Sequence, residues 1–180
     1  PNVRRYVVAC GGGDLGRSTD YGRTFTGYWG FFGGFNFVKM DSLRPTTVYA
    51  GGMSGLWGPL LLKSVDTAKT WELLMEGYGV PSNPANDIAI HPTSPDTVWL
   101  AFEHGIAKSV DGGHTWSNHF SSGDFRFRTI EVDQHRPEYL YASGGLIPGL
   151  LTLYISRNGG LSWSSVSDTI LLQNPVADIL

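Results

Sequence analysis

The stretch KSVDGGHTW, from Lys108 to Trp116, is one of four similar nine-residue segments in this chain. The other three are RSTDYGRTF at 17–25, KSVDTAKTW at 63–71 and ISRNGGLSW at 155–163. We call these four segments the repeat turns. Their shared acid or amide falls at Asp20, Asp66, Asp111 and Asn158, at intervals of 46, 45 and 47 residues. A regular interval of this size indicates an array of similar supersecondary units.

A second register supports the same interval. The segments VKMDSLRPTTVYAGG at 38–52, IAIHPTSPDTVWLAF at 88–102 and IEVDQHRPEYLYASG at 130–144 align without gaps. Their shared prolines are Pro45, Pro95 and Pro137, and their shared aromatic residues are Tyr49, Trp99 and Tyr141. Two independent registers make a chance repeat implausible.

Composition narrows the class of protein. Of 180 residues, 41% are hydrophobic and 13% aromatic, which is ample for a packed core. The net charge of −3 and the lack of basic runs argue against nucleic acid as a partner. No apolar run reaches the roughly 18 residues of a membrane-spanning segment, so membrane insertion is not predicted. Cys10 is the single cysteine, so we expect no internal disulfide and a small buried side chain at this position.

Each repeat contains four predicted strands. In the third, the runs NDIAIHP, TVWLAFE, GIAKSVD and WSNHF are rich in β-branched and aromatic residues and are bounded by turn residues. No window has a helical period. We therefore predict an all-β chain, a β-propeller domain over 1–180 made of four-stranded antiparallel blades. The predicted blades are 1–31 plus 174–180, 34–77, 86–121 and 126–168.

The repeat turns have a predicted structural role. The Asp and the Ser before it can accept hydrogen bonds from backbone N–H groups, and the Gly two residues after the Asp can adopt left-handed backbone. The closing aromatic residue is expected to wedge the hairpin against a neighbouring strand. We expect strain where Ala68 replaces the Gly, and a retained acceptor without charge at Asn158. The predicted turn residues are Ser18, Asp20, Gly22, Phe25, Ser64, Asp66, Trp71, Ser109, Asp111, Gly113, Trp116, Ser156, Asn158, Gly160 and Trp163.

The pattern S-x-D-x-G-x-T-W, with the HP-x-x-P-D-x-V-W segment at His91 to Trp99, resembles the Asp-box (BNR) repeat. Such repeats occur in sialidases, sortilin-type receptors, xyloglucan-cleaving glucanases and propeller assembly factors of photosystem II. The resemblance covers essentially the whole chain and implies a propeller. It leaves the function open, because enzymes, receptors and scaffolds share the repeat. The resemblance to these families implies an extracellular or periplasmic location.

The two ends of the chain are predicted to share one blade. RRYVVACG at 4–11 corresponds to a second strand, and NPVADIL at 174–180 corresponds to a first strand. A closed ring of four blades, a part of a larger propeller and a ring completed by two chains all remain open. The last of these would make the chain self-associate through its split blade.

Loops on the propeller face opposite the repeat turns are irregular and Gly-rich, which favours binding there. The predicted ligand-binding residues on these loops are Trp29, Phe31, Phe32, Trp57, Tyr78, His104 and Phe125. Exposed aromatic rings can stack on sugars or anchor a partner protein. Alternatively, these rings fill the space between blades. On the repeat-turn face, Arg23, Asp41, Lys69, His91, His114 and Asp133 are expected to be structural or solvated.

Asp87 and Asp178 are weak catalytic candidates. They hold equivalent positions at the start of innermost strands, where two carboxylates could act on a glycosidic bond. Asp14, Glu103 and Asp124 are further acids on that face. An Asp before an apolar strand can instead accept hydrogen bonds from backbone N–H groups. No arginine trio of the sialidase kind can be assembled, and no metal-ligand spacing or cofactor motif is present.

The preferred prediction is a non-catalytic propeller that binds a glycan or a partner protein through its aromatic loops. The alternative is a glycoside hydrolase of the xyloglucanase kind, or a fragment of one. A third is a structural subunit of a surface or filament assembly.

Overall fold

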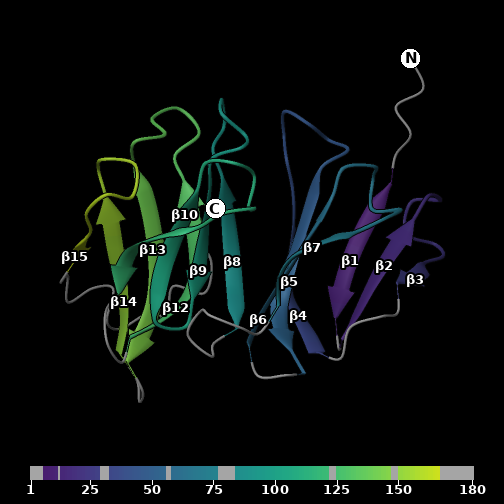
Figure 1. The fold of residues 1–180 in the computed structure, drawn as a ribbon, viewed down its shortest axis with the longest axis horizontal. Coiled ribbons are helices and arrows are strands. Elements are labelled where there is room, and N and C mark those ends of the chain that lie inside the picture. Colours follow the sequence, from purple (N-terminus) through teal and green to yellow (C-terminus); the bar gives the residue numbers. More distant parts are fainter. Residues whose placement is uncertain are drawn as a thin grey trace. The chain divides into compact units, whose positions relative to one another are not determined.

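A computed structural model describes residues 6–11, 13–28, 33–55, 58–76, 84–121, 125–146 and 150–166. All regular structure in these ranges is β-strand, which confirms the all-β prediction. The strands form four antiparallel sheets, one of three strands and three of four (Figure 1). The chain divides into two compact units, unit 1 over Pro1–Pro84 and unit 2 over Ala85–Leu180.

Unit 1 contains the first two sheets. The first has the order β1 (Val7–Gly11), β2 (Asp14–Ser18) and β3 (Thr26–Tyr28). The second has β4 (Gly33–Met40), β5 (Val48–Ser54), β6 (Gly58–Ser64) and β7 (Glu72–Glu76). The strand predicted at 174–180 to complete the first blade lies outside the described residues.

Unit 2 contains two four-stranded sheets. The third sheet has the order β8 (Ala85–Ile90), β9 (Val98–Phe102), β10 (Gly105–Ser109) and β11 (Ser117–Ser121). The fourth has β12 (Arg126–Val132), β13 (Leu140–Leu146), β14 (Leu150–Ser156) and β15 (Ser164–Val166). The described part of the chain has no helix that could cross a membrane.

Hydrophobic residues between the sheets of each unit form its core. In unit 1, Leu15 of the first sheet packs with Phe35, Ala50, Leu60 and Leu62 of the second, and Cys10 packs partly buried against them. In unit 2, Trp99 and Ile106 of the third sheet pack with Phe127, Ile130 and Leu140 of the fourth. Each large apolar side chain removed from water contributes roughly 1.5–3 kcal/mol to stability.

The first strand of each four-stranded sheet is interrupted at the same position. The register shifts between Phe35 and Phe37 in β4, between Ala85 and Asp87 in β8, and between Phe127 and Thr129 in β12. A β-bulge bends a strand and increases its local twist. The bulge is therefore part of the repeat, although its sequence carries no obvious signal.

All four repeat turns fold in the same way. In the third turn, Ser109 Oγ accepts hydrogen bonds from the N–H of Gly113 at 2.8 Å and of Asp111 at 3.3 Å. The Asp111 carboxylate accepts from Thr115 N at 2.9 Å and Thr115 Oγ1 at 2.6 Å. In the other copies, the acceptors of the corresponding bonds are Ser18, Asp20, Ser64, Asp66, Ser156 and Asn158.

Two consecutive residues of each turn have left-handed backbone, where the sequence suggested one. In the third turn these are Gly112 at φ 73° and Gly113 at φ 98°. In the second turn they are Thr67 at 65° and Ala68 at 59°, and neither is glycine. This conformation destabilises the fold by roughly 1–2 kcal/mol for each residue other than glycine that adopts it. The expected strain at Ala68 is present, and it extends to Thr67.

The carboxylates of the repeat turns are held in their charged form. Hydrogen bonds from Thr24, followed by one from Ser18, lower the pKa of Asp20 to about 2. Hydrogen bonds led by those from Thr70 lower the pKa of Asp66 well below its usual range, and those from Thr115 do the same for Asp111. At Asn158 the uncharged amide oxygen accepts from Ser162 N at 2.9 Å, and the bond to the hydroxyl is reversed, because Asn158 Nδ2 donates to Ser162 Oγ at 2.8 Å.

Three of the four repeat turns are also tied to the proline-containing loop of their own sheet. The N–H groups of Thr67, Gly112 and Gly159 donate to the carbonyls of Thr46, Asp96 and Glu138 at 2.8–2.9 Å. At the start of each loop, Asp41 Oδ1, His91 Nδ1 or Asp133 Oδ1 accepts from two backbone N–H groups. These residues are structural, because their acceptor atoms hold the loop closed.

Candidate ligand-binding site

Most aromatic residues predicted to bind a ligand lie outside the described residues, namely Trp29, Phe31, Phe32, Trp57 and Tyr78. Phe125 is described, and its predicted exposure is wrong. Its side chain is 3% exposed, with its ring centroid 4.7 Å from Phe127 and 4.9 Å from Tyr154. Phe125 therefore belongs to the core, because these neighbouring rings cover it.

The carboxylate of Asp87 accepts hydrogen bonds from backbone N–H groups. Its Oδ1 accepts from Ile88 N at 2.8 Å, and its Oδ2 accepts from Ile130 N at 3.0 Å. The second bond joins the third sheet to the fourth. This is the strand-entry role that the sequence offered as the alternative to catalysis. Its proposed partner Asp178 lies outside the described residues.

Glu103 and His104 lie in the tight turn between β9 and β10. Glu103 forms an ion pair in which its Oε1 lies 2.5 Å from Arg126 Nη1. Its backbone carbonyl accepts from Phe127 N at 3.0 Å, so this turn also links the two sheets of unit 2. The Nδ1 atom of His104 is buried and has no hydrogen-bond partner among the described residues. In the same ranges, no group of three or more His, Cys, Asp or Glu could hold a metal ion.

The aromatic residues that close the repeat turns differ in environment. Trp116 and Trp163 are partly buried, and their indole N–H groups donate to the carbonyls of Gly113 and Gly160 at 2.8 and 3.2 Å. Phe25 is 47% exposed, so it does not act as a buried wedge. Trp71 is partly buried against the core of unit 1. Its indole N–H has no acceptor among the described residues.

In two of the four repeat turns, the residue before the serine links neighbouring sheets, a role that the sequence did not suggest. Arg17 of β2 donates from Nε to the carbonyl of Thr67 at 2.6 Å and from Nη2 to Thr67 Oγ1 at 3.3 Å. In unit 2, Lys108 of β10 donates to the equivalent carbonyl of Gly159 at 3.1 Å. The signal in the sequence is the series Arg17, Lys63 and Lys108, which ends at Ile155.

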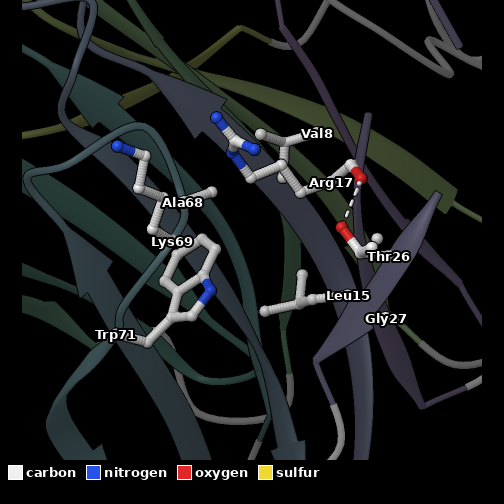
Figure 2. A pocket seen from close by; sticks show the side chains of 9 residues that line it. Val8, Leu15, Arg17, Thr26, Gly27, Ala68, Lys69 and Trp71 are labelled. Carbon is white, nitrogen blue, oxygen red and sulfur yellow. Dashed lines mark hydrogen bonds between the residues drawn. The ribbon is translucent and has the colours of Figure 1, made fainter. Parts of the chain in front are cut away.

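A pocket with a volume of about 280 Å³ lies between the two sheets of unit 1. The first sheet contributes one wall, and the second repeat turn contributes the other. Figure 2 shows Trp71 and Leu15 facing each other across this space, with the indole nitrogen of Trp71 on the inner side. The cationic ends of Arg17 and Lys69 lie toward one end of the group (Figure 2). The lining residues are Val8, Leu15, Gly16, Arg17, Thr26, Gly27, Ala68, Lys69 and Trp71.

The pocket offers hydrogen-bond donors and positive charge around apolar walls. Arg17 and Lys69 supply two cations, and the lining residues include no carboxylate. The Thr26 hydroxyl donates to the Arg17 carbonyl at 3.0 Å, so its oxygen can still accept. The lining therefore does not supply the two carboxylates that cleave a glycosidic bond. Among the lining residues, Lys69 was expected to be structural or solvated and Trp71 to be a structural residue of the repeat turn, so the sequence did not predict this pocket.

No family model matches the sequence, and no curated protein matches it. Solved structures do match. A GH74 xyloglucanase from Xanthomonas campestris has 18% identity and a TM-score of 0.66, over 91% of this chain and 28% of that one. A chain of the nidogen/laminin complex has 14% identity and a TM-score of 0.65, over 89% of this chain and 60% of that one. YCF48 bound to D1 peptide has 12% identity and a TM-score of 0.58, over 92% of this chain and 45% of that one.

These similarities show the fold. The chain is built of the four-stranded antiparallel blades of a β-propeller, as the sequence predicted. It spans between about a quarter and three fifths of the lengths of these structures. They include an enzyme as well as propellers described in complexes with other proteins. The fold therefore does not decide between catalysis and binding.

Proposed function

We propose that this chain forms an Asp-box β-propeller, whole or partial, that acts as a non-catalytic binding module for a glycan or a partner protein. The repeat turns support the Asp-box assignment through their common hydrogen bonds. The observation that carries the proposal is the pocket of unit 1. It combines Trp71, two cations and apolar walls, and its lining lacks the acid and base that hydrolysis needs.

The roles of the nominated acids support binding over catalysis. Asp87 accepts from two backbone N–H groups, and Glu103 is paired with Arg126. A general acid needs a proton to donate and access to the substrate. Neither geometry provides this, because both carboxylates hold the sheets of unit 2 together.

Protein partners are favoured by the structures to which this chain is similar, since two of them are described with bound peptide or protein. The predicted aromatic loops, which include Trp29 and Trp57, would add contacts on the propeller face opposite the repeat turns. An extracellular or periplasmic place remains part of this proposal.

The proposal is tested by binding and hydrolysis assays on the same protein. A glycan array and a set of immobilised peptides are probed with wild type and with Trp29→Ala, Trp57→Ala and Trp71→Ala. Trp163→Ala is the control, because Trp163 packs against Phe120 in unit 2 rather than lining the pocket. We expect binding that falls in at least one of the three variants and persists in the control. Release of reducing sugar from a β-glucan panel, lost in Asp87→Asn, would contradict the proposal and favour the hydrolase.

A further inference from the structure

The pocket of unit 1 lies at a position where the other repeats carry an aromatic side chain. The cross-strand pairs that precede the repeat turns are Val8 with Arg17, Tyr49 with Lys63, Trp99 with Lys108 and Tyr141 with Ile155. Three of the four pairs have a large ring at the first position. Val8 is the exception, and it lines the pocket.

Unit 2 shows how an aromatic residue fills this position. Trp99 is 1% exposed, and its indole N–H donates to the carbonyl of Gly159 at 3.2 Å. Lys108 Nζ lies 5.1 Å from the centroid of the same ring. A Cβ atom at Gly160 would lie 2.7 Å from Trp99 Nε1, closer than real contacts allow. The buried indole therefore requires a glycine in the facing turn.

Unit 1 has the complementary pair of residues. Val8 replaces the large ring, and Ala68 occupies the position of Gly160 despite its left-handed φ of 59°. Val8 carries no indole that this methyl group would meet, as a Cβ at Gly160 would meet Trp99. Arg17 lies 5.9 Å from the ring centroid of Tyr6, but Tyr6 does not line the pocket. The pocket therefore corresponds to an aromatic side chain that Trp99 supplies in unit 2 and that Val8 does not supply in unit 1.

We propose that this pocket receives an aromatic side chain from a partner protein, at a site where acidic residues flank that side chain. The inference rests on the proposed binding function and names the partner's chemistry. An apolar cavity of about 150 Å³ already accommodates benzene, so about 280 Å³ has room for an indole or phenol ring. Leu15 and Trp71 would contact the two faces of the inserted ring.

Charge and hydrogen bonding give the acidic part of the proposal. Arg17 keeps its side chain in place through Thr67, and its Nη1 has no acceptor among the described residues. Lys69 is exposed at the rim, and the Trp71 indole N–H faces the pocket (Figure 2). These groups donate hydrogen bonds, so the complementary surface is rich in acceptors and negatively charged. Carboxylates beside the inserted ring meet both requirements.

The test uses the whole chain and three short capped peptides, Glu-Trp-Asp, Lys-Trp-Lys and Glu-Ala-Asp, titrated by calorimetry or by ligand-observed NMR. We expect Glu-Trp-Asp to bind at least tenfold more tightly than Glu-Ala-Asp, because burial of the ring supplies most of the affinity. We also expect Lys-Trp-Lys to bind more weakly than Glu-Trp-Asp, with the difference shrinking as salt screens the charges. Equal binding of all three peptides, or binding of none, would overturn the inference.

Two variants separate the ring from the charge. Val8→Trp combined with Ala68→Gly reproduces the arrangement of unit 2, and we expect it to abolish binding of Glu-Trp-Asp. Lys69→Gln leaves the cavity open, and we expect a loss of about two- to fivefold for Glu-Trp-Asp and no loss for Lys-Trp-Lys. If the double variant does not fold, Lys69→Gln and the peptide comparison still decide. Retained tight binding in a folded double variant would overturn the inference.

The outcome also distinguishes this inference from the proposed function. Binding of a glycan or another partner that is insensitive to Val8→Trp with Ala68→Gly, together with no binding of Glu-Trp-Asp to the wild type, would support the binding module and refute the aromatic pocket. A β-glucan oligosaccharide serves as the negative control. We expect that it does not displace the peptide and does not shift the NMR signals of the residues that line the pocket. If that oligosaccharide bound in the pocket instead of the peptide, the occupant named here would be wrong.

Discussion

Replacing Ser109 by alanine tests the hydrogen bonds that hold a repeat turn. The Ser109 hydroxyl is buried, at 2% exposure, and accepts from Gly113 N at 2.8 Å and Asp111 N at 3.3 Å. It donates to Asp111 Oδ1 at 2.7 Å. Alanine removes all three bonds and leaves the buried N–H of Gly113 without its acceptor.

The expected loss follows from that stranded donor. A buried polar group left unsatisfied costs about 1–3 kcal/mol. The volume change from serine to alanine is small, so we expect no added cavity cost. For a chain of this size, 1 kcal/mol lowers the melting temperature by roughly 2–4 °C. The predicted fall in unfolding free energy for unit 2 is therefore about 1–3 kcal/mol.

The measurement is urea unfolding followed by tryptophan fluorescence, in which Trp99, Trp116 and Trp163 report on unit 2. Ser94→Ala is the matched control, because Ser94 is exposed in the same unit and its hydroxyl forms no hydrogen bond to a described residue. An exposed substitution of this kind changes stability by less than about 0.5 kcal/mol. If the two variants were equally stable, the serine would not be a structural acceptor and the account of the turns would fail.

Three further substitutions are expected to change stability in defined directions. Ala68→Gly relieves the strain of a left-handed backbone and is expected to stabilise unit 1 by about 0.5–1 kcal/mol. Gly160→Ala is expected to destabilise unit 2 by more than about 1 kcal/mol, because the added Cβ atom would meet Trp99. Urea unfolding measures both changes. Asp87→Ala costs about 1–3 kcal/mol by removing the acceptor of Ile130 N, and hydrogen exchange at that amide should rise. Burial, with a smaller contribution from Lys108, lowers the pKa of His91, so its contribution to stability is present above about pH 6.5 and is lost as pH falls through the lowered value. His91→Asp should flatten that decline in a pH series of melting curves, and an unchanged decline would exclude His91 as its source.

The repeat and its turns could be predicted because they depend on local chemistry. A serine and an aspartate two residues apart satisfy backbone N–H groups within the same turn, whatever the rest of the chain does. The strands followed from runs of β-branched and aromatic residues. The left-handed backbone of the residue directly after the Asp or Asn was not predicted. Tyr21 and Thr67 rarely adopt it, and only Gly112 and Gly159 in the other two turns indicate it.

Contacts between sheets could not be predicted from local patterns. Phe125 follows a Gly-containing loop and suggested exposure, but rings from β12 and β14 cover it. Arg17 and Lys108 carried no prediction of a contact, but each donates to a carbonyl of the next repeat turn. The pocket had one signal in the sequence, Val8 at an otherwise aromatic position. That signal becomes informative only when the strand register pairs Val8 with Arg17.

The central claim is that the pocket of unit 1 receives an aromatic side chain from a partner. An NMR titration of the indole N–H signals tests this claim most directly. Capped Glu-Trp-Asp peptide is added to protein labelled with ¹⁵N at tryptophan. The account predicts that the Trp71 signal shifts, while the signals of Trp99 and Trp163, whose indoles donate to Gly159 and Gly160 carbonyls, stay in place. A Trp71 signal that does not move, or equal shifts of all three signals, would contradict it.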